Sequence, residues 1–171
     1  MAVEKLCEDY FNLQIPQPAP GYLRYLDKFY CFNIDYPSKW SVYNDTLSDD
    51  NGHDVRLSDR SDINSSIVAV FVRPVFQDIT LEDVKNAIAT GNYLPNLEMP
   101  VLSSFQNSLF SYGNYVNNLP TLTAEADFGG HRTLYVTIAS PIMLVFVVVQ
   151  NEADANPWIL QNMIDSVHIM K

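Results

Sequence analysis

Apolar residues near the start of the chain repeat at helical spacing and then give way to a group of prolines. They recur three and four positions apart over residues 3–13, which predicts a short helix. The segment IPQPAPG follows, and its three prolines within five residues favour an extended connector over a helix. We therefore expect a helical arm and connector over residues 1–20 and a single domain over residues 21–171.

Beyond the connector the apolar residues alternate with polar ones, as they do in half-buried strands. Residues 28–37 (KFYCFNIDYP) alternate in this way, a second short strand begins at Trp40, and residues 54–59 resume the pattern. Residues 66–72 are almost all β-branched or aromatic, which is typical of a strand buried on both faces. One face of the first strand is expected to carry Tyr30, Phe32, Ile34 and Tyr36.

The middle of the chain contains the clearest helix signal. Thr80 precedes an apolar stripe, and Asp83 stands three residues later, as in a capping box. Gly91 is the expected helix stop. A shorter helix is predicted over residues 101–109.

The last third of the chain predicts three strands followed by a helix. The strands cover residues 122–128, 133–139 and 142–150, and the third is almost wholly apolar and therefore central. Asn156 and Pro157 form a good cap and first turn for the helix. Its buried side is expected to carry Ile159, Leu160, Met163, Ile164 and Val167. Antiparallel hairpins with inserted helices define an α+β fold.

Two segments are similar to structural anchors of the Mog1/PsbP-like family. FNIDYPSKWSV resembles the family's opening strand, Tyr-Pro turn and Trp, and ILQNMIDSVHI resembles its last helix and tail. The resemblance spans residues 29–170. It implies an antiparallel sheet with helices on both faces, and it implies proteins that dock on partners, as PsbP does on photosystem II and Mog1 on the GTPase Ran. No active site accompanies these anchors.

The charge of the chain narrows the range of partners. It has 171 residues, with 20 acidic and 10 basic side chains and a formal net charge of −10. Only Arg132 and Lys171 follow Lys85 among the basic residues, so nucleic acid is excluded as a partner. A protein partner with a basic surface fits this negative charge. We expect the chain itself to be a monomer or a weak dimer.

The apolar runs and the cysteines indicate in which cellular compartment the protein could work. The longest apolar run, residues 141–149, is about half the length of a membrane span. The first residues contain acids where a signal peptide has an apolar core, so we expect a soluble chain of unknown compartment. For Cys7 and Cys31 we expect two reduced thiols, with one disulfide as the alternative.

An acidic loop over residues 45–62 is a candidate metal site. It holds six of the 20 acids, and it includes Asn51-Gly52, a hairpin-turn signal. Oxygen ligands and one imidazole could bind Ca²⁺ or Mn²⁺ there, although the spacing is not that of an EF-hand. A solvated hairpin tip is the other interpretation. The candidate ligands are Asp49, Asp50, His53 and Asp54.

Catalytic motifs do not occur in the sequence. There is no G-x-S-x-G, H-E-x-x-H or phosphate-binding glycine loop. His131 lies near Asp127 and Arg132 after a Gly-Gly turn, and we interpret it as a surface histidine. We therefore expect a protein that is not an enzyme.

The N-terminal arm is the remaining candidate for a partner-binding site. Its Tyr10 and Phe11 could bind a partner, or the arm could fold back on its own domain. The sequence thus predicts a non-catalytic protein-binding or assembly module without a cofactor. The alternative is a small-ligand or Ca²⁺/Mn²⁺-binding protein that uses the acidic loop.

Overall fold

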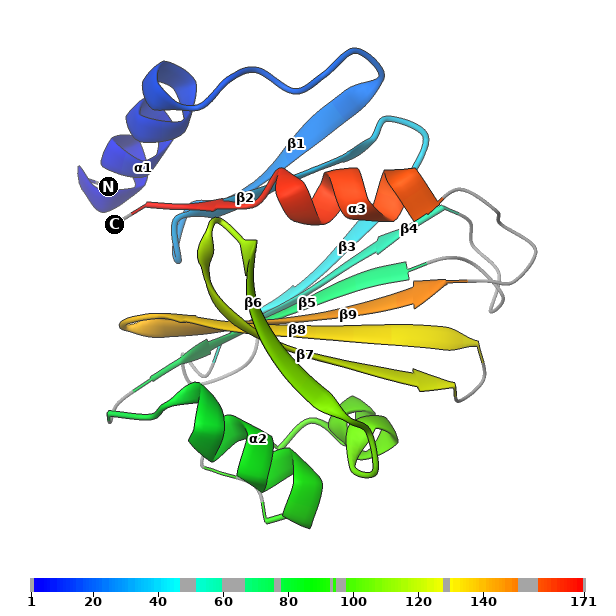
Figure 1. Ribbon diagram of the computed structural model, residues 1–171. Coiled ribbons are helices and arrows are strands. Elements are labelled where there is room, and N and C mark those ends of the chain that lie inside the picture. The colour runs from blue at the N-terminus through cyan, green and yellow to red at the C-terminus, as the bar shows by residue number, and fades with distance from the viewer. Residues whose placement is uncertain are drawn as a thin grey trace.

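The structure is a computed structural model of the whole chain (Figure 1). It describes residues 2–46, 52–59, 67–75, 78–92, 94, 98–127, 130–150 and 157–170.

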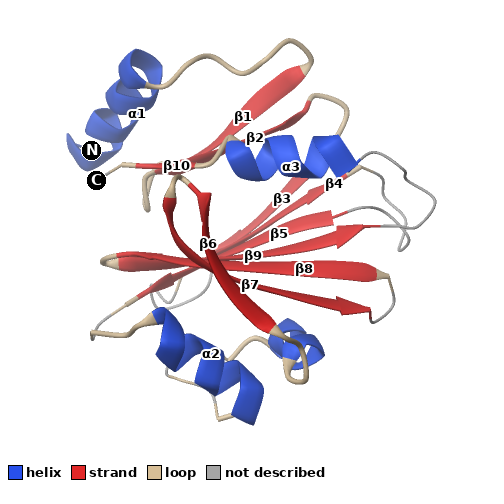
Figure 2. Cartoon of the chain, viewed as in Figure 1, coloured by secondary structure: helices blue, strands red, loops and turns tan. Residues whose placement is uncertain are grey.

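A large antiparallel sheet forms the centre of the molecule. Its seven strands follow the order β3-β4-β5-β9-β8-β7-β6 (Figure 2). Because β9 is central and apolar at nearly every position, it is buried on both faces, as its sequence predicted. The strands are β3 (Ser41–Thr46), β4 (His53–Ser58), β5 (Ile67–Pro74), β6 (Phe110–Val116), β7 (Leu119–Asp127), β8 (His131–Ala139) and β9 (Ile142–Gln150).

A second, three-stranded sheet lies beside the first. It contains β1 (Tyr22–Asp27), β2 (Phe32–Pro37) and the short β10 (His168–Ile169), with β2 in the middle. The predicted first strand over residues 28–37 was four residues too long. The Asp27 carboxylate accepts the backbone N–H groups of Phe29 and Tyr30, which closes a turn where alternation alone suggested a strand.

Helices cover both faces of the large sheet. On one face lies α3 (Pro157–Asp165), and on the other lie α2 (Leu81–Thr90) and the 3₁₀ helix η2 (Pro100–Phe105) (Figure 1). The Thr80–Asp83 capping box and the left-handed Gly91 cap of α2 are both present as predicted. The predicted helix over residues 101–109 is wrong in extent, because the 3₁₀ helix ends at Phe105 and Leu109 is exposed.

The two faces of the sheet bury separate apolar clusters, which alternate along β9. One cluster packs β4, β5 and β9 against the small sheet and α3, and it includes Phe32, Phe146 and Met163. The other packs β7, β8 and β9 against α2 and η2, and it includes Ile88 and Phe105. Period-two alternation of side chains explains how one strand serves both clusters.

The N-terminal arm, α1 (Ala2–Gln14), packs beside the small sheet through a third cluster. Cys7 and Cys31 form a disulfide there, with their Cα atoms 5.6 Å apart. The expectation of two reduced thiols was therefore wrong, because the helix that carries Cys7 is folded back onto the turn before β2. In the described part of the chain, no helix is long and apolar enough to cross a membrane.

Candidate binding groove

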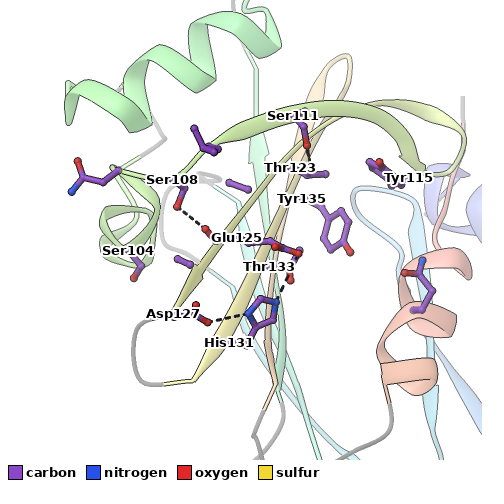
Figure 3. A pocket seen from close by; sticks show the side chains of 15 residues that line it. Ser104, Ser108, Ser111, Tyr115, Thr123, Glu125, Asp127, His131, Thr133 and Tyr135 are labelled. Atoms are coloured by element: carbon purple, nitrogen blue, oxygen red, sulfur yellow. Dashed lines mark hydrogen bonds and ion pairs between the residues drawn. The ribbon is translucent and has the colours of Figure 1, made fainter.

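A polar groove of about 920 Å³ opens beside α3, on the sheet face formed by β6, β7 and β8 (Figure 3). Thr123 and Glu125 of β7 and Thr133 and Tyr135 of β8 line it. Their neighbours Leu122 and Leu134 turn to the opposite face and are fully buried. Strict alternation therefore gives these strands one dry face and one polar face that is open to solvent.

His131 lies between two carboxylates at the open end of the groove. Its Nδ1 is 3.1 Å from Asp127 Oδ1, and its Nε2 is 3.9 Å from Glu125 Oε1. The two acids therefore contact opposite sides of the imidazole ring, so the three side chains cannot converge on one ion. Consistent with this, the described residues contain no group of three acidic, histidine or cysteine side chains placed to hold a metal.

Two tyrosines form the inner wall of the groove. The rings of Tyr115 and Tyr135 meet edge to face, with their centroids 6.2 Å apart. Burial raises the pKa of the Tyr135 hydroxyl, and the negative charges of Glu125 and Asp165 raise it further. Tyr135 therefore keeps its proton, and can donate a hydrogen bond, up to a higher pH than an ordinary tyrosine.

The position of Tyr115 depends on a glycine and a β-bulge in β6. A Cβ atom added to Gly113 would lie 2.4 Å from Cε2 of the Tyr115 ring, so the ring occupies space that only glycine leaves free. The pairing of β6 with β7 shifts between Gly113 and Val116. The buried Thr121 hydroxyl accepts the N–H groups of Tyr115 and Val116, each at 3.3 Å, and so holds the bulge.

Hydroxyl groups line the rest of the groove. Ser111 and Thr123 hydrogen bond to each other at 2.7 Å, and the Ser108 hydroxyl donates to the Glu125 carbonyl at 2.8 Å. Among the described residues that line the groove, none is lysine or arginine. Arg132 lies between groove-facing neighbours on β8, and its side chain donates to Oγ of the groove-lining Ser104 at 3.4 Å, so this cation lies beside the groove. The charged side chains among the described lining residues themselves are acidic, apart from His131.

Two of the four predicted metal ligands, His53 and Asp54, lie in the described part of the chain and do not come together. His53 and Asp54 are consecutive residues of β4, and each has a different partner. His53 Nδ1 contacts Asp27 Oδ2 at 2.6 Å, whereas Asp54 Oδ1 forms an ion pair with Arg73 at 2.7 Å. Because consecutive strand residues face opposite ways, His53 and Asp54 do not converge on one point, and the four-residue metal site stays a prediction. Asp49 and Asp50 lie outside the described residues.

The arm residues are also not both free to bind a partner. Phe11 is 1% exposed and packs against the disulfide, and the Tyr10 ring meets it edge to face. In the structure the arm folds back on its own domain, which was one of the two alternatives for it. Phe11 is therefore part of the fold, and Tyr10 remains half-buried beside it.

The strand predicted over residues 122–128 included Thr123, Glu125 and Asp127, but the sequence did not indicate a groove. The missing element was β6, which supplies Ser111 and Tyr115. Its sequence, FSYGNYV, does alternate weakly, but the bulge interrupts the period.

Comparison with known proteins adds one finding. No protein-family model and no curated protein sequence matches the chain. Among solved structures, the chain is similar to cyanobacterial PsbP (CyanoP) from Synechocystis sp. PCC 6803, with a TM-score of 0.59 and 17% sequence identity. The similarity covers 90% of this chain and 95% of that one. At this level of identity the likeness concerns the fold, and the chain has a PsbP-like α+β fold.

Proposed function

We propose that the protein is a non-catalytic binding module that docks on a basic region of a partner protein through the groove. The observation that carries this proposal is the charge of the groove. Glu125 and Asp127 line it, Asp165 acts on Tyr135 from α3, and none of its described lining residues is lysine or arginine. A like-charged partner would be repelled, whereas lysine or arginine side chains would be attracted.

The hydrogen bonds within the groove support a binding role over a catalytic one. Ser108 and Ser111 bond to a carbonyl and to a threonine hydroxyl, and His131 contacts the carboxylates of Asp127 and Glu125. Nucleophilic catalysis needs a hydroxyl or thiol paired with a base. Among the described groove residues, the hydrogen bonds contain no such pair.

The disulfide supports an oxidising compartment as the place where this binding occurs. Disulfide bonds persist in secreted and other extracytoplasmic proteins and are rare where glutathione keeps thiols reduced. The Cys7–Cys31 bond anchors the arm within the fold. We therefore place the proposed partner in an extracytoplasmic compartment too.

Affinity capture with matched variants tests this function. The groove variant Glu125→Gln/Asp127→Asn removes two charges, and the control variant Asp78→Asn/Glu98→Gln removes two exposed charges elsewhere. A partner from the producing cells should bind the wild type and the control but not the groove variant. It should also be released near 1 M salt, where screening acts within about 3 Å. Equal capture by all three proteins, or capture that survives high salt, overturns the proposal.

A further inference from the structure

Strand β6 leaves one edge of the large sheet open. Among the described strands it pairs only with β7, so the backbone groups of alternate β6 residues point away from the sheet. Proteins commonly protect such an edge with charged residues, proline or a β-bulge. The sequence FSYGNYV contains no charged residue or proline, and its bulge comes only after Gly113, so residues 110–113 keep regular strand geometry. The β6 edge therefore retains the capacity to pair with another strand.

The open edge and the groove are parts of one surface. Ser111 and Tyr115 of β6 line the groove together with Glu125 of β7. Neighbouring strands lie about 4.8 Å apart, so a strand added beyond β6 would lie about 10 Å from β7. The side chain of a lysine on the groove side of that strand and the side chain of Glu125 can bridge this separation when both extend toward each other.

We propose that the partner contributes an extended segment, with lysine or arginine at alternate positions, that adds to β6 as a further antiparallel strand. This inference rests on the proposed function and specifies the partner segment. Main-chain hydrogen bonds to β6 would provide affinity, and basic side chains over the groove would provide specificity. Pairing is centred on Phe110–Gly113, because the bulge after Gly113 disturbs the regular edge.

The charges argue against a second copy of this chain as the occupant. Each copy carries a formal net charge of −10, and β6 itself contributes no basic side chain. Pairing two β6 edges would bring two acidic grooves close together. A basic segment instead neutralises Glu125 and Asp127 as it pairs.

A defined peptide tests the inference on the intact protein. The probe is acetylated and amidated Lys-Val-Lys-Val-Lys-Val-Lys, and its counterpart carries glutamate in place of every lysine. Calorimetry should show binding of the lysine peptide at low salt. Its affinity should fall at least about tenfold for Glu125→Gln/Asp127→Asn but not for Asp78→Asn/Glu98→Gln, and the glutamate peptide should not bind.

Amide hydrogen exchange then locates the bound peptide. Strand addition should slow exchange at outward-pointing amides within residues 110–113, with no change in β3. A peptide that binds without protecting β6 leaves the acidic groove as a docking site but overturns strand addition. Failure of the lysine peptide to bind also overturns it, while the proposed function is judged separately by affinity capture. Protection of β6 that rises with protein concentration alone identifies a second copy instead.

Discussion

The Asp27 carboxylate at the end of β1 contacts the His53 imidazole at the start of β4, with Oδ2 and Nδ1 2.6 Å apart. The contact joins the small sheet to the large one. The Asp27 side chain is only 1% exposed, and its other oxygen accepts two backbone N–H groups, at 3.0 Å from Phe29 and 2.8 Å from Tyr30. One carboxylate therefore fixes both the β1–β2 turn and the packing of the two sheets.

Replacement of Asp27 by alanine should destabilise the protein strongly. The variant leaves buried donors without an acceptor, and each such group costs about 1–3 kcal/mol. We expect a loss of about 3 kcal/mol in the free energy of unfolding, measured by urea denaturation. Asp78→Ala, at an exposed site, is the control and should change the free energy by less than about 0.5 kcal/mol. Equal effects of the two variants would show that the turn and the sheet contact do not depend on Asp27.

Much of the fold follows from period and caps, because both are local properties. The alternation in β7, the apolar run of β9 and the Thr80–Asp83 box of α2 were readable from neighbouring residues alone. The division into two sheets was not readable, because it depends on contacts such as Asp27 with His53, which are distant in sequence. Asn33 and Asp35 alternate with the apolar residues of the predicted first strand, yet both are buried. Distant residues satisfy them, since Asn33 bonds to Ser166 and Asp35 to Arg24.

The stability of the protein should fall at alkaline pH, and Tyr25 is one cause. Burial raises the pKa of its hydroxyl, and the negative charge of Asp27 and a hydrogen bond to that carboxylate raise it further. Above about pH 10 the unfolded tyrosine loses its proton while the folded one keeps it. The unfolded state then binds fewer protons, so the free energy of unfolding decreases as the pH rises.

Urea denaturation between about pH 8 and 11 measures this effect. In Tyr25→Phe the decline above pH 10 should be shallower than in the wild type, although other tyrosines such as Tyr135 still contribute. Tyr22→Phe, which removes a tyrosine hydroxyl from the same strand, is the matched control. If Tyr25→Phe and the wild type lose stability with the same slope, Tyr25 does not cause the decline.

Loss of the disulfide should destabilise the protein and loosen α1. The bond links residues 24 positions apart, and closing a loop of this length in the unfolded chain contributes about 3 kcal/mol. We expect a loss of this size for Cys7→Ala/Cys31→Ala. Relative to the wild type, amide exchange in the variant should speed up more in α1 than in β9. A reducing agent should lower the stability of the wild type but leave the double variant unchanged. An equal response of both proteins to reduction would exclude the disulfide as the cause.

The groove could be predicted only in part, and the incompleteness of the prediction has a physical cause. A strand that contains a bulge and a glycine has a weak period, so β6 gave no clear signal and Tyr115 could not be assigned to the face that holds Glu125. His131 was noticed beside Asp127, but its second acidic neighbour, Glu125, is brought close only by the β7–β8 pairing, in which Glu125 lies opposite Thr133. The acidic loop attracted attention because it holds six acids within 18 residues, whereas only two acids, Glu125 and Asp127, are among the described residues that line the groove.

Substitution of Gly113 by alanine should move the Tyr115 ring out of the groove wall. The added methyl group would lie 2.4 Å from Cε2 of that ring, and the half-exposed side chain can swing toward solvent. We expect the nuclear Overhauser contacts between Tyr115 and Tyr135 to disappear and the free energy of unfolding to fall by about 1 kcal/mol, the typical value of an aromatic pair. In a Tyr115→Ala background the same glycine substitution should cost much less, because no ring remains to be displaced. A double-mutant cycle measures this difference, and equal costs in the two backgrounds would mean that Gly113 acts on the β6 backbone and not through Tyr115.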